Sequence, residues 1–183
     1  MQVICTDFYG KAHQVDANSL IDRLSAYGVY IASGKVLLIQ DPRSHRWELP
    51  GGGVERGETI RQGLVREFIE ETGITPKGKF KLVTQWTEYY FDVPTNQAWR
   101  SERKFYLVPA IADGAHLLSR GNGEDSAIAK LFPLDDLRVL HATEYIRKVV
   151  EIASGLVYNY GSPAKNNSGA SPGSCLGTGL TFH

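Results

Sequence analysis

Three glutamates lie close together in one short stretch of the sequence: Glu67, Glu70 and Glu71. Apolar residues recur around them at helical spacing, which predicts a helix from about Glu58 to Thr72. With about 100° of rotation per residue, Glu67 and Glu71 fall at the edge of the buried face and Glu70 lies further out. Carboxylates so close repel one another, and a divalent cation would relieve that repulsion. Oxygen ligands of this kind suit Mg²⁺ or Mn²⁺.

A run of glycines, Gly51–Gly53, stands just ahead of this helix. Glycine permits backbone conformations closed to other residues and lets backbone groups approach a ligand closely. Glycines alone can be a mere turn, and adjacent glutamates alone can be a solvated helix face. Together they favour a site that holds metal ions and polarises phosphate. Arg66, four residues before Glu70, is expected to form an ion pair with it.

The stretch from Gly52 to Ile74 resembles the signature of the Nudix hydrolase family, G-x5-E-x7-R-E-U-x-E-E-x-G-U, where U is an apolar residue. In this chain the fixed positions are Gly52, Glu58, Arg66, Glu67, Glu70, Glu71 and Gly73. Every one of them matches, and Phe68 is the least typical filler of a U position. The lead-in, Trp47-Glu48-Leu49-Pro50-Gly51, also looks like the family's approach to the signature.

The resemblance implies an α/β fold, the Nudix-type α/β/α sandwich with a mixed β-sheet. It also implies Mg²⁺-dependent cleavage (Mn²⁺ being the alternative) of a nucleoside diphosphate linked to another moiety, X. The residues implied to serve catalysis are Glu67, Glu70, Glu71 and Arg66. The implied metal ligands are the same three glutamates and the carbonyl group of Gly51.

The general base varies across the family and stays open here. It is one of the signature glutamates or an acid from a later loop, where this chain has Glu124 and Asp125. The alternative reading of those two acids is a solvated loop. By the family pattern, Glu58 and Arg66 would orient the helix and the loop.

The signature is shared by enzymes with many substrates, so other residues must select the substrate. We expect substrate contacts from Trp86 and Tyr90, in an aromatic strand, and from Arg46, although such residues are often core or solvated. The preferred substrate is a nucleoside triphosphate or related nucleotide, as for MutT-like enzymes. The alternatives are a dinucleoside polyphosphate, ADP-ribose or a nucleotide sugar. A different class, a regulatory domain that binds a nucleotide without hydrolysing it, is disfavoured by the intact glutamates.

Composition sets further bounds on the function. A chain of 183 residues with 42% hydrophobic residues fits one domain with a substantial core. The net charge is zero, so a nucleic-acid partner is not indicated. No apolar run would span a bilayer, and the N-terminus lacks signal-peptide features. Cys5 and Cys175 form no CxxC unit, which fits a cytoplasmic protein. A homodimer stays open.

Three regions are expected along the chain. Residues 1–22 form an N-terminal strand or hairpin, residues 23–153 the Nudix domain, and residues 154–183 a tail rich in Gly, Ser and Pro. The expected strands are 23–32 and 35–40 as one hairpin, 80–93 and 103–112 as a second hairpin, and 127–132. The final helix is expected from Thr143, its N-cap, through Ala153.

Overall fold

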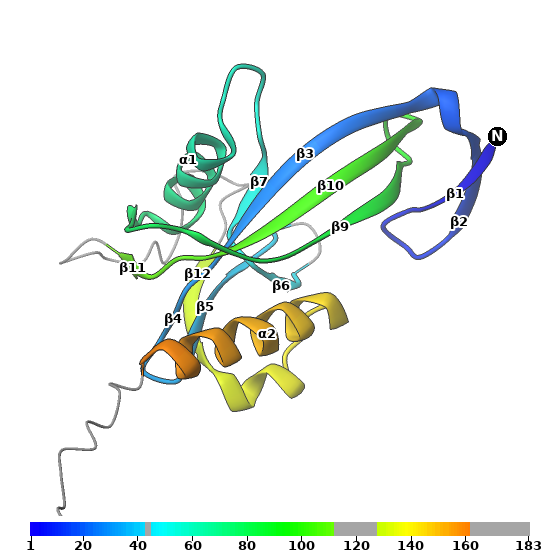
Figure 1. Cartoon of the computed structure of the whole chain (residues 1–183). Helices are drawn as coiled ribbons and strands as arrows, with labels where there is room; N and C mark the ends of the chain where they lie inside the picture. The colour runs from blue at the N-terminus through cyan, green and yellow to red at the C-terminus, as the bar shows by residue number, and fades with distance from the viewer. Residues whose placement is uncertain (43–44, 112–127, 162–183) are drawn as a thin grey trace, which may run out of the picture.

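The described strands form three β-sheets (Figure 1). The computed structural model describes residues 1–42, 45–111 and 128–161. The largest sheet has the strand order β2-β1-β9-β10-β3-β7. These strands are β1 (Gln2–Thr6), β2 (Ala12–Asp16), β3 (Leu20–Val29), β7 (Gly51–Gly53), β9 (Lys81–Asp92) and β10 (Gln97–Leu107). β10 runs parallel to β3 and antiparallel to β9, so the predicted mixed sheet is confirmed.

A second sheet is built on β5 (Lys35–Gln40), which pairs with three strands. They are β4 (Ile31–Ala32), β6 (Trp47–Glu48) and β12 (Ile128–Pro133), and a small third sheet pairs β8 (Pro76–Lys77) with β11 (Ala110–Ile111). The hairpin expected from residues 23–40 is made by β4 and β5 alone. β3 instead pairs with β10 and β7, and Tyr30 links it to β4, so the chain passes from one sheet into the other.

The hairpin of β9 and β10 is confirmed, but its second strand begins earlier than expected. Gln97 already pairs with Asp92, because the turn closes between Val93 and Asn96. β10 therefore spans Gln97–Leu107 instead of 103–112. Residue 112 lies outside the described part of the chain.

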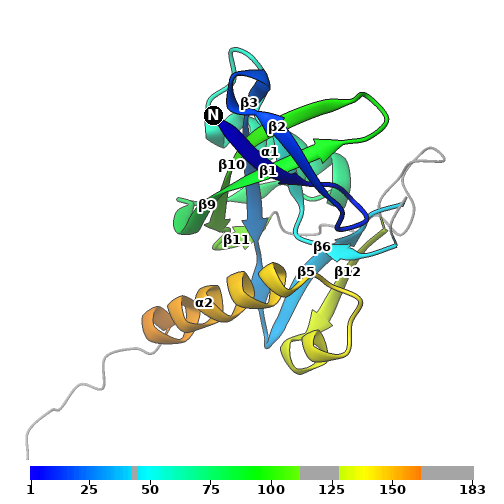
Figure 2. The ribbon, with the colours of Figure 1, turned by 90° about the vertical axis from the view of Figure 1, so that its right-hand side faces the viewer.

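The two α-helices of the described chain cover opposite sides of the sheets (Figures 1 and 2). They are α1 (Ile60–Thr72) and α2 (Glu144–Gly161); two short 3-10 helices are η1 (Ala17–Ser19) and η2 (Leu134–Arg138). Gly28 of β3 backs onto Phe68 of α1, where an added Cβ would lie 2.8 Å from the ring. The next residue, Val29, belongs to the cluster under α2. The predicted α/β/α sandwich is confirmed.

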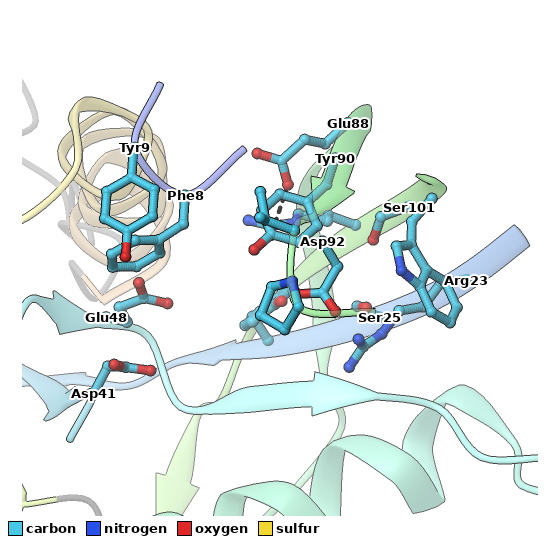
Figure 3. Close-up of a pocket in the computed structure, with 15 residues that line it drawn as sticks. Phe8, Tyr9, Arg23, Ser25, Asp41, Glu48, Glu88, Tyr90, Asp92 and Ser101 are labelled. Atoms are coloured by element: carbon cyan, nitrogen blue, oxygen red, sulfur yellow. Dashed lines mark ion pairs between the residues drawn. The ribbon is translucent and has the colours of Figure 1, made fainter. Parts of the chain in front are cut away.

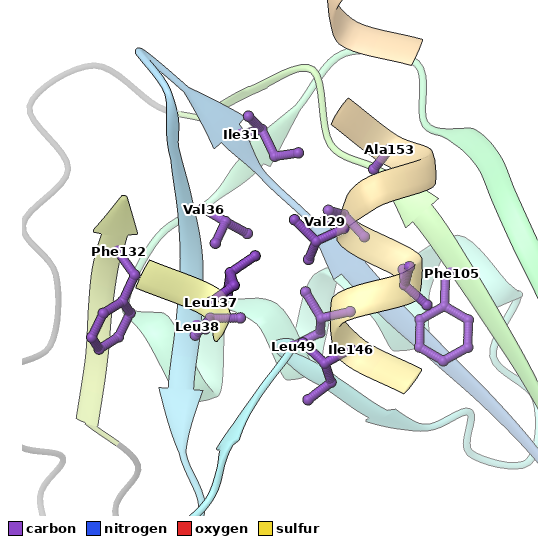
Figure 4. Close-up of a cluster of buried hydrophobic side chains, with 12 residues drawn as sticks. Val29, Ile31, Val36, Leu38, Leu49, Phe105, Phe132, Leu137, Ile146 and Ala153 are labelled. Carbon is purple, nitrogen blue, oxygen red and sulfur yellow. The ribbon is translucent and has the colours of Figure 1, made fainter. Parts of the chain in front are cut away.

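Two buried apolar clusters hold the layers together. In the larger one, Ile146 and Ala153 of α2 pack with Val29 and Phe105 of the large sheet (Figure 4). The second lies beneath α1, where Phe68 packs among residues of the second sheet such as Leu37, Ile39 and Ala129. Each large apolar side chain buried in this way stabilises the fold by about 1.5–3 kcal/mol.

The ends of α1 are set by hydrogen bonds that the sequence encodes. Thr59 and Gln62 form a capping box, so the helix begins at Ile60, slightly later than the expected Glu58. Gly73 adopts a left-handed conformation with φ of 72° and donates its N–H to the carbonyl of Ile69. The helix therefore ends where the sequence predicted. The two fixed ends of α1 also fix where its glutamates lie along the helix.

α2 begins directly after Thr143, as expected, but continues to Gly161. Val157 prolongs the apolar spacing of Val149 and Ala153 and packs against the same cluster, which explains the additional turns. Residues 154–161 are thus helical, and residues 162–183 of the expected tail lie outside the described part of the chain. None of the described helices has the length and apolarity needed to cross a bilayer.

The expected N-terminal hairpin is present as β1 and β2, which pair along their whole length. It extends the large sheet, because β1 runs parallel to β9 with Thr6 opposite Tyr90. Figure 1 shows this hairpin at the end of the sheet remote from α1. The turn of the hairpin therefore lies beside the aromatic segment of β9.

Candidate active site

The glycine run forms β7 at the edge of the large sheet. Gly51 lies opposite Tyr27 of β3, and Gly53 lies opposite Ser25. A Cβ on Gly51 would lie 2.3 Å from the carbonyl oxygen of Ala26, and its φ is 139°. Only glycine fits this close backbone approach. The glycines of the signature thus bring the loop tightly against β3.

Two glutamates of α1 reach back to this loop. The N–H of Gly51 donates to Oε2 of Glu71 at 2.8 Å. Gly52 leaves room for Glu67, because an added Cβ would lie 2.8 Å from the Cδ of that carboxylate. The loop and the helix therefore form one unit. Backbone groups and carboxylates meet at its centre.

Arg66 holds this unit together. Its Nε donates to Oε1 of Glu58 at 2.8 Å, and its Nη2 donates to Oε2 of Glu58 at 3.0 Å and to the carbonyl of Gly53 at 2.9 Å. Its Nη1 donates to Glu67 at 2.9 Å and to Glu70 at 3.3 Å, so the expected pairing with Glu70 is present. The hydrogen bonds from Arg66 are the main cause that lowers the pKa of Glu58 to about 2.

Glu71 is half-buried, as is Glu67. Burial raises its pKa to about 8, against the opposing effect of the Gly51 hydrogen bond, and the nearby charges of Glu67, Glu48 and Glu70 raise it further. A carboxylate in these surroundings gains from a bound cation. Glu70, by contrast, has a side chain that is 57% exposed. This order of exposure agrees with the helical geometry expected from the sequence.

The implied metal ligands have the right chemistry but are not gathered into a ready site. Glu67, Glu70 and Glu71 offer the carboxylate oxygens that Mg²⁺ prefers. Among the described residues, however, no three His, Cys, Asp or Glu side chains group closely enough to hold an ion. Nη1 of Arg66 donates to both Glu67 and Glu70. The three carboxylates fit a divalent cation by their donor chemistry, and Glu58 binds the same guanidinium group through Nε and Nη2.

A cavity of about 610 Å³ lies on the face of the large sheet opposite α1 (Figure 3). Side chains alternate along a strand, and Gly28 faces α1. Tyr27, Ser25 and Arg23 of β3 therefore point to the other face, where they line the cavity. Because Tyr27 and Ser25 lie opposite Gly51 and Gly53, the cavity adjoins the glycine loop.

β10 supplies a second row of cavity residues: Trp99, Ser101 and Arg103. Ser101 lies opposite Arg23 of β3, so the two rows are side by side. Sequence reasoning missed these residues. The signal was the two-residue spacing of Trp99, Ser101 and Arg103, which places them on one face of a strand. A strand expected to begin at residue 103 does not include the first two of them.

The cavity also contains a half-buried ion pair. Nη2 of Arg103 lies 2.6 Å from Oε2 of Glu88, while the buried Nε of Arg103 has no hydrogen-bond partner among the described residues. Glu48, which precedes the glycine loop, lines the same space, and burial is the main cause that raises its pKa. The cavity thus offers both donors and acceptors to the edge of a polar ligand.

The expected substrate residues fall in different places. Tyr90 lines the cavity. The guanidinium carbon of Arg46 lies 5.3 Å from the ring centre of Phe8, a cavity residue of the N-terminal hairpin. Trp86 does not line the cavity: its ring stacks on Phe105 at 4.3 Å within the α2 cluster. Its large apolar ring is needed there for packing. Glu124 and Asp125 lie outside the described residues.

A family model described as the NUDIX domain matches residues 22–151, and the chain therefore belongs to the NUDIX family. The MutT NUDIX hydrolase from Burkholderia pseudomallei has a similar structure, with a TM-score of 0.56, 25% identity, and coverage of 72% of this chain and 97% of that chain. An Ap4A hydrolase from C. elegans shares the fold, with a TM-score of 0.53, 18% identity, and coverage of 77% of this chain and 100% of that chain.

Curated relatives match over shorter stretches. An RNA pyrophosphohydrolase from Bartonella quintana is 43% identical over 51 residues, which is 28% of this chain and 28% of that protein. An ADP-ribose pyrophosphatase from Methanocaldococcus jannaschii is 46% identical over 58 residues, or 30% of this chain and 34% of that protein. The chain thus matches only about a third or less of the length of these relatives. Their names are those of pyrophosphate-cleaving hydrolases.

Proposed function

We propose that this protein is a hydrolase that cleaves the pyrophosphate linkage of a nucleoside diphosphate joined to X, with Mg²⁺ or Mn²⁺. The observation that carries the proposal is the contact between Gly51 and Glu71. It joins the glycine loop to Glu71 of α1, and β3, the strand paired with this loop, lines a cavity of about 610 Å³, a size suited to a small-molecule ligand. The family membership supports the same reaction class.

The roles of the residues follow from their surroundings. Glu67, Glu70 and Glu71, with the carbonyl of Gly51, would hold the cation, which when bound neutralises pyrophosphate charge and activates water. Arg66, which binds Glu58 and the carbonyl of Gly53, would fix the position of the helix relative to the loop. One of the three glutamates would accept the proton of the attacking water.

The preferred substrate is a nucleoside triphosphate or a related nucleotide, as for MutT-like enzymes. Dinucleoside polyphosphates, ADP-ribose and nucleotide sugars are the alternatives, and the names of the neighbours include both an Ap4A hydrolase and an ADP-ribose pyrophosphatase. The relative named as an RNA pyrophosphohydrolase adds a triphosphorylated RNA end to the substrates to be tested. We also propose a cytoplasmic location, and a homodimer stays open.

The test is a hydrolysis screen with Mg²⁺ over nucleoside triphosphates, dinucleoside polyphosphates, ADP-ribose, nucleotide sugars and triphosphorylated RNA, with products identified by mass spectrometry. Glu70→Gln should lower turnover of the best substrate by about 10²- to 10⁴-fold, because it removes a charged carboxylate that serves as ligand or base. Glu151→Gln, an exposed change on α2, is the matched control. Full activity of Glu70→Gln, or equal wild-type activity in EDTA, would contradict the proposal.

A regulatory domain without catalysis is the competing class. It would bind nucleotides in the same cavity but release no product in the screen. Calorimetric binding together with zero turnover, across all substrates and both metals, would decide for this alternative. The intact set of Glu67, Glu70 and Glu71 favours catalysis.

A further inference from the structure

The turn between β1 and β2 forms one wall of the cavity. Phe8 and Tyr9, at the tip of this turn, line the cavity together with residues of the large sheet (Figure 3). Both side chains are exposed, Phe8 by 44% and Tyr9 by 85%. Tyr9 therefore contributes little to the core, and its aromatic face is available to a ligand. The hairpin precedes residue 22, where the match to the family begins.

The conformation of the turn is fixed by Asp7. The side chain of Asp7 is only 3% exposed and accepts hydrogen bonds from the backbone N–H groups of Tyr9 and Lys11, both at 2.9 Å. Its second oxygen lies 2.7 Å from Nε2 of His13. The His13 ring in turn stacks on Phe91 of β9, with ring centres 4.1 Å apart and planes 10° from parallel. The turn is thus attached to the sheet in one orientation.

Aromatic residues also line the opposite side of the cavity. Tyr90 of β9 and Trp99 of β10 are directly paired in register and both line the space. Figure 3 shows Phe8 and Tyr9 on one side of the cavity and Tyr90 on the other. Arg46 lies over the Phe8 ring and adds a positive charge to the turn side. A space with aromatic rings on both sides and polar groups between them suits a flat heteroaromatic ring.

We propose that Phe8 and Tyr9 form a stacking wall for the nucleobase of the substrate, so that the N-terminal hairpin helps to determine specificity. The inference rests on the proposed function, because it assumes a nucleotide in this cavity. Asp7 and His13 act as positioning residues, since they fix the turn and do not line the cavity themselves. The hairpin thus adds a base-contacting surface from outside the residues matched by the NUDIX family.

The test is calorimetric binding of ATP, GTP, CTP and UTP in EDTA, with inorganic tripolyphosphate as the base-free comparison. The double variant Phe8→Ala/Tyr9→Ala should raise the Kd of the best-bound nucleotide about tenfold and leave the Kd of tripolyphosphate unchanged. In the hydrolysis assay KM should rise while kcat stays unchanged. Ile4→Ala is the matched control, because Ile4 is 67% exposed on the same hairpin but lies outside the cavity.

The positioning role of Asp7 has its own test. Asp7→Ala should weaken nucleotide binding as the double variant does, because the backbone N–H groups of Tyr9 and Lys11 lose their carboxylate acceptor. Asp7→Asn retains an acceptor oxygen and should restore most of the affinity. Circular dichroism would show that each variant is folded.

The outcomes separate the inference from the proposed function. Unchanged nucleotide affinity in the double variant, or an equal loss for tripolyphosphate, would overturn the stacking wall while leaving the proposed hydrolase in place. Wild-type protein that neither binds nor cleaves any nucleotide would overturn the proposed function and the stacking wall with it.

Discussion

Arg66 holds Glu58 through two hydrogen bonds, from Nε to Oε1 at 2.8 Å and from Nη2 to Oε2 at 3.0 Å. The same Nη2 also binds the carbonyl of Gly53. Three separate pieces of the site are joined in this way: the glycine strand, the loop after it and helix α1. The guanidinium group has five donors in a fixed plane, which a lysine would not supply. Arg66 and Glu58 therefore position the glutamates without needing to contact the substrate.

Weakening this pair should lower activity without abolishing it. Glu58→Gln removes the charge and one acceptor, so Arg66 is held less firmly and its Nη1 competes longer for Glu67 and Glu70. Loss of such a supporting contact typically costs about 10- to 100-fold in metal affinity or activity. We expect the Mg²⁺ concentration for half-maximal activity to rise, as measured by metal titration of initial rates. Glu144→Gln, at the exposed start of α2, should behave as wild type; an unchanged metal titration for Glu58→Gln would refute the supporting role.

The same pair should make stability depend on acid pH. The pKa of Glu58 falls from 4.5 to about 2 in the folded protein, chiefly through the hydrogen bonds from Arg66 and next through the backbone N–H of Glu55. A group with a lowered folded pKa adds stability that is fully present above its unfolded pKa and is lost as the pH falls toward the folded value. Wild type should therefore lose stability more steeply than Glu58→Gln between pH 4.5 and about 2. Urea unfolding in EDTA would measure this, and parallel curves would contradict it.

The attachment of α1 to the sheets depends on Phe68. This residue is fully buried, and its ring lies against Gly28 and within the cluster of Leu37, Ile39 and Val108. Phe68→Ala should lower the free energy of unfolding by about 3–5 kcal/mol, because it removes buried apolar surface and leaves a cavity. Chemical denaturation would give this value.

The neighbouring residue provides the control for Phe68. Ile69 is 38% exposed on the same helix, so Ile69→Ala should cost clearly less than Phe68→Ala. Equal losses for the two variants would show that the helix does not depend on the Phe68 cluster.

The half-buried ion pair of Arg103 and Glu88 in the cavity should affect substrate affinity. Arg103→Met retains an apolar chain of similar length but removes the buried donor Nε and the partner of Glu88. Hydrogen bonds to charged groups contribute about 1.5–3 kcal/mol, so KM for the best substrate should rise about tenfold or more. kcat should change much less, because Arg103 lies away from the glutamates of α1. Steady-state kinetics would separate the two constants.

Lys104→Met is the matched control for Arg103. Lys104 is the next residue on β10, pairs with Glu102 and does not line the cavity. The KM of the Lys104→Met variant should stay at the wild-type value. The double variant Arg103→Met/Glu88→Gln should recover stability lost when Glu88 is left unpaired, which would distinguish a charge effect from general damage.

Local features of the chain were readable from sequence alone. The spacing of Arg66, Glu67, Glu70 and Glu71, with Gly73 after them, predicted a capped helix with carboxylates at the edge of its buried face. This prediction succeeded because helix geometry and glycine conformations act over a few residues. The mixed sheet and the sandwich were expected from the family resemblance and are confirmed.

Other features depended on contacts between distant segments. The start of β10 was misplaced, so the row of Trp99, Ser101 and Arg103 was missed. Trp86 was expected at the substrate but is packed under α2 by Phe105 and Tyr145. Which face of β9 is covered by a helix depends on where α2 docks, and this is not encoded near Trp86 itself.

The sequence by itself determined the helix with its glutamates, the glycine strand and the class of chemistry that they suit, because these follow from local spacing and residue type. Only the tertiary structure decided that Arg66 donates to both Glu67 and Glu70 while Glu58 and Gly53 hold it from the other side. It also decided that a turn near the N-terminus, at Phe8 and Tyr9, faces Tyr90 across one cavity. The physical reason is that sheet pairing joins residues about 80 positions apart, as it does for Thr6 and Tyr90.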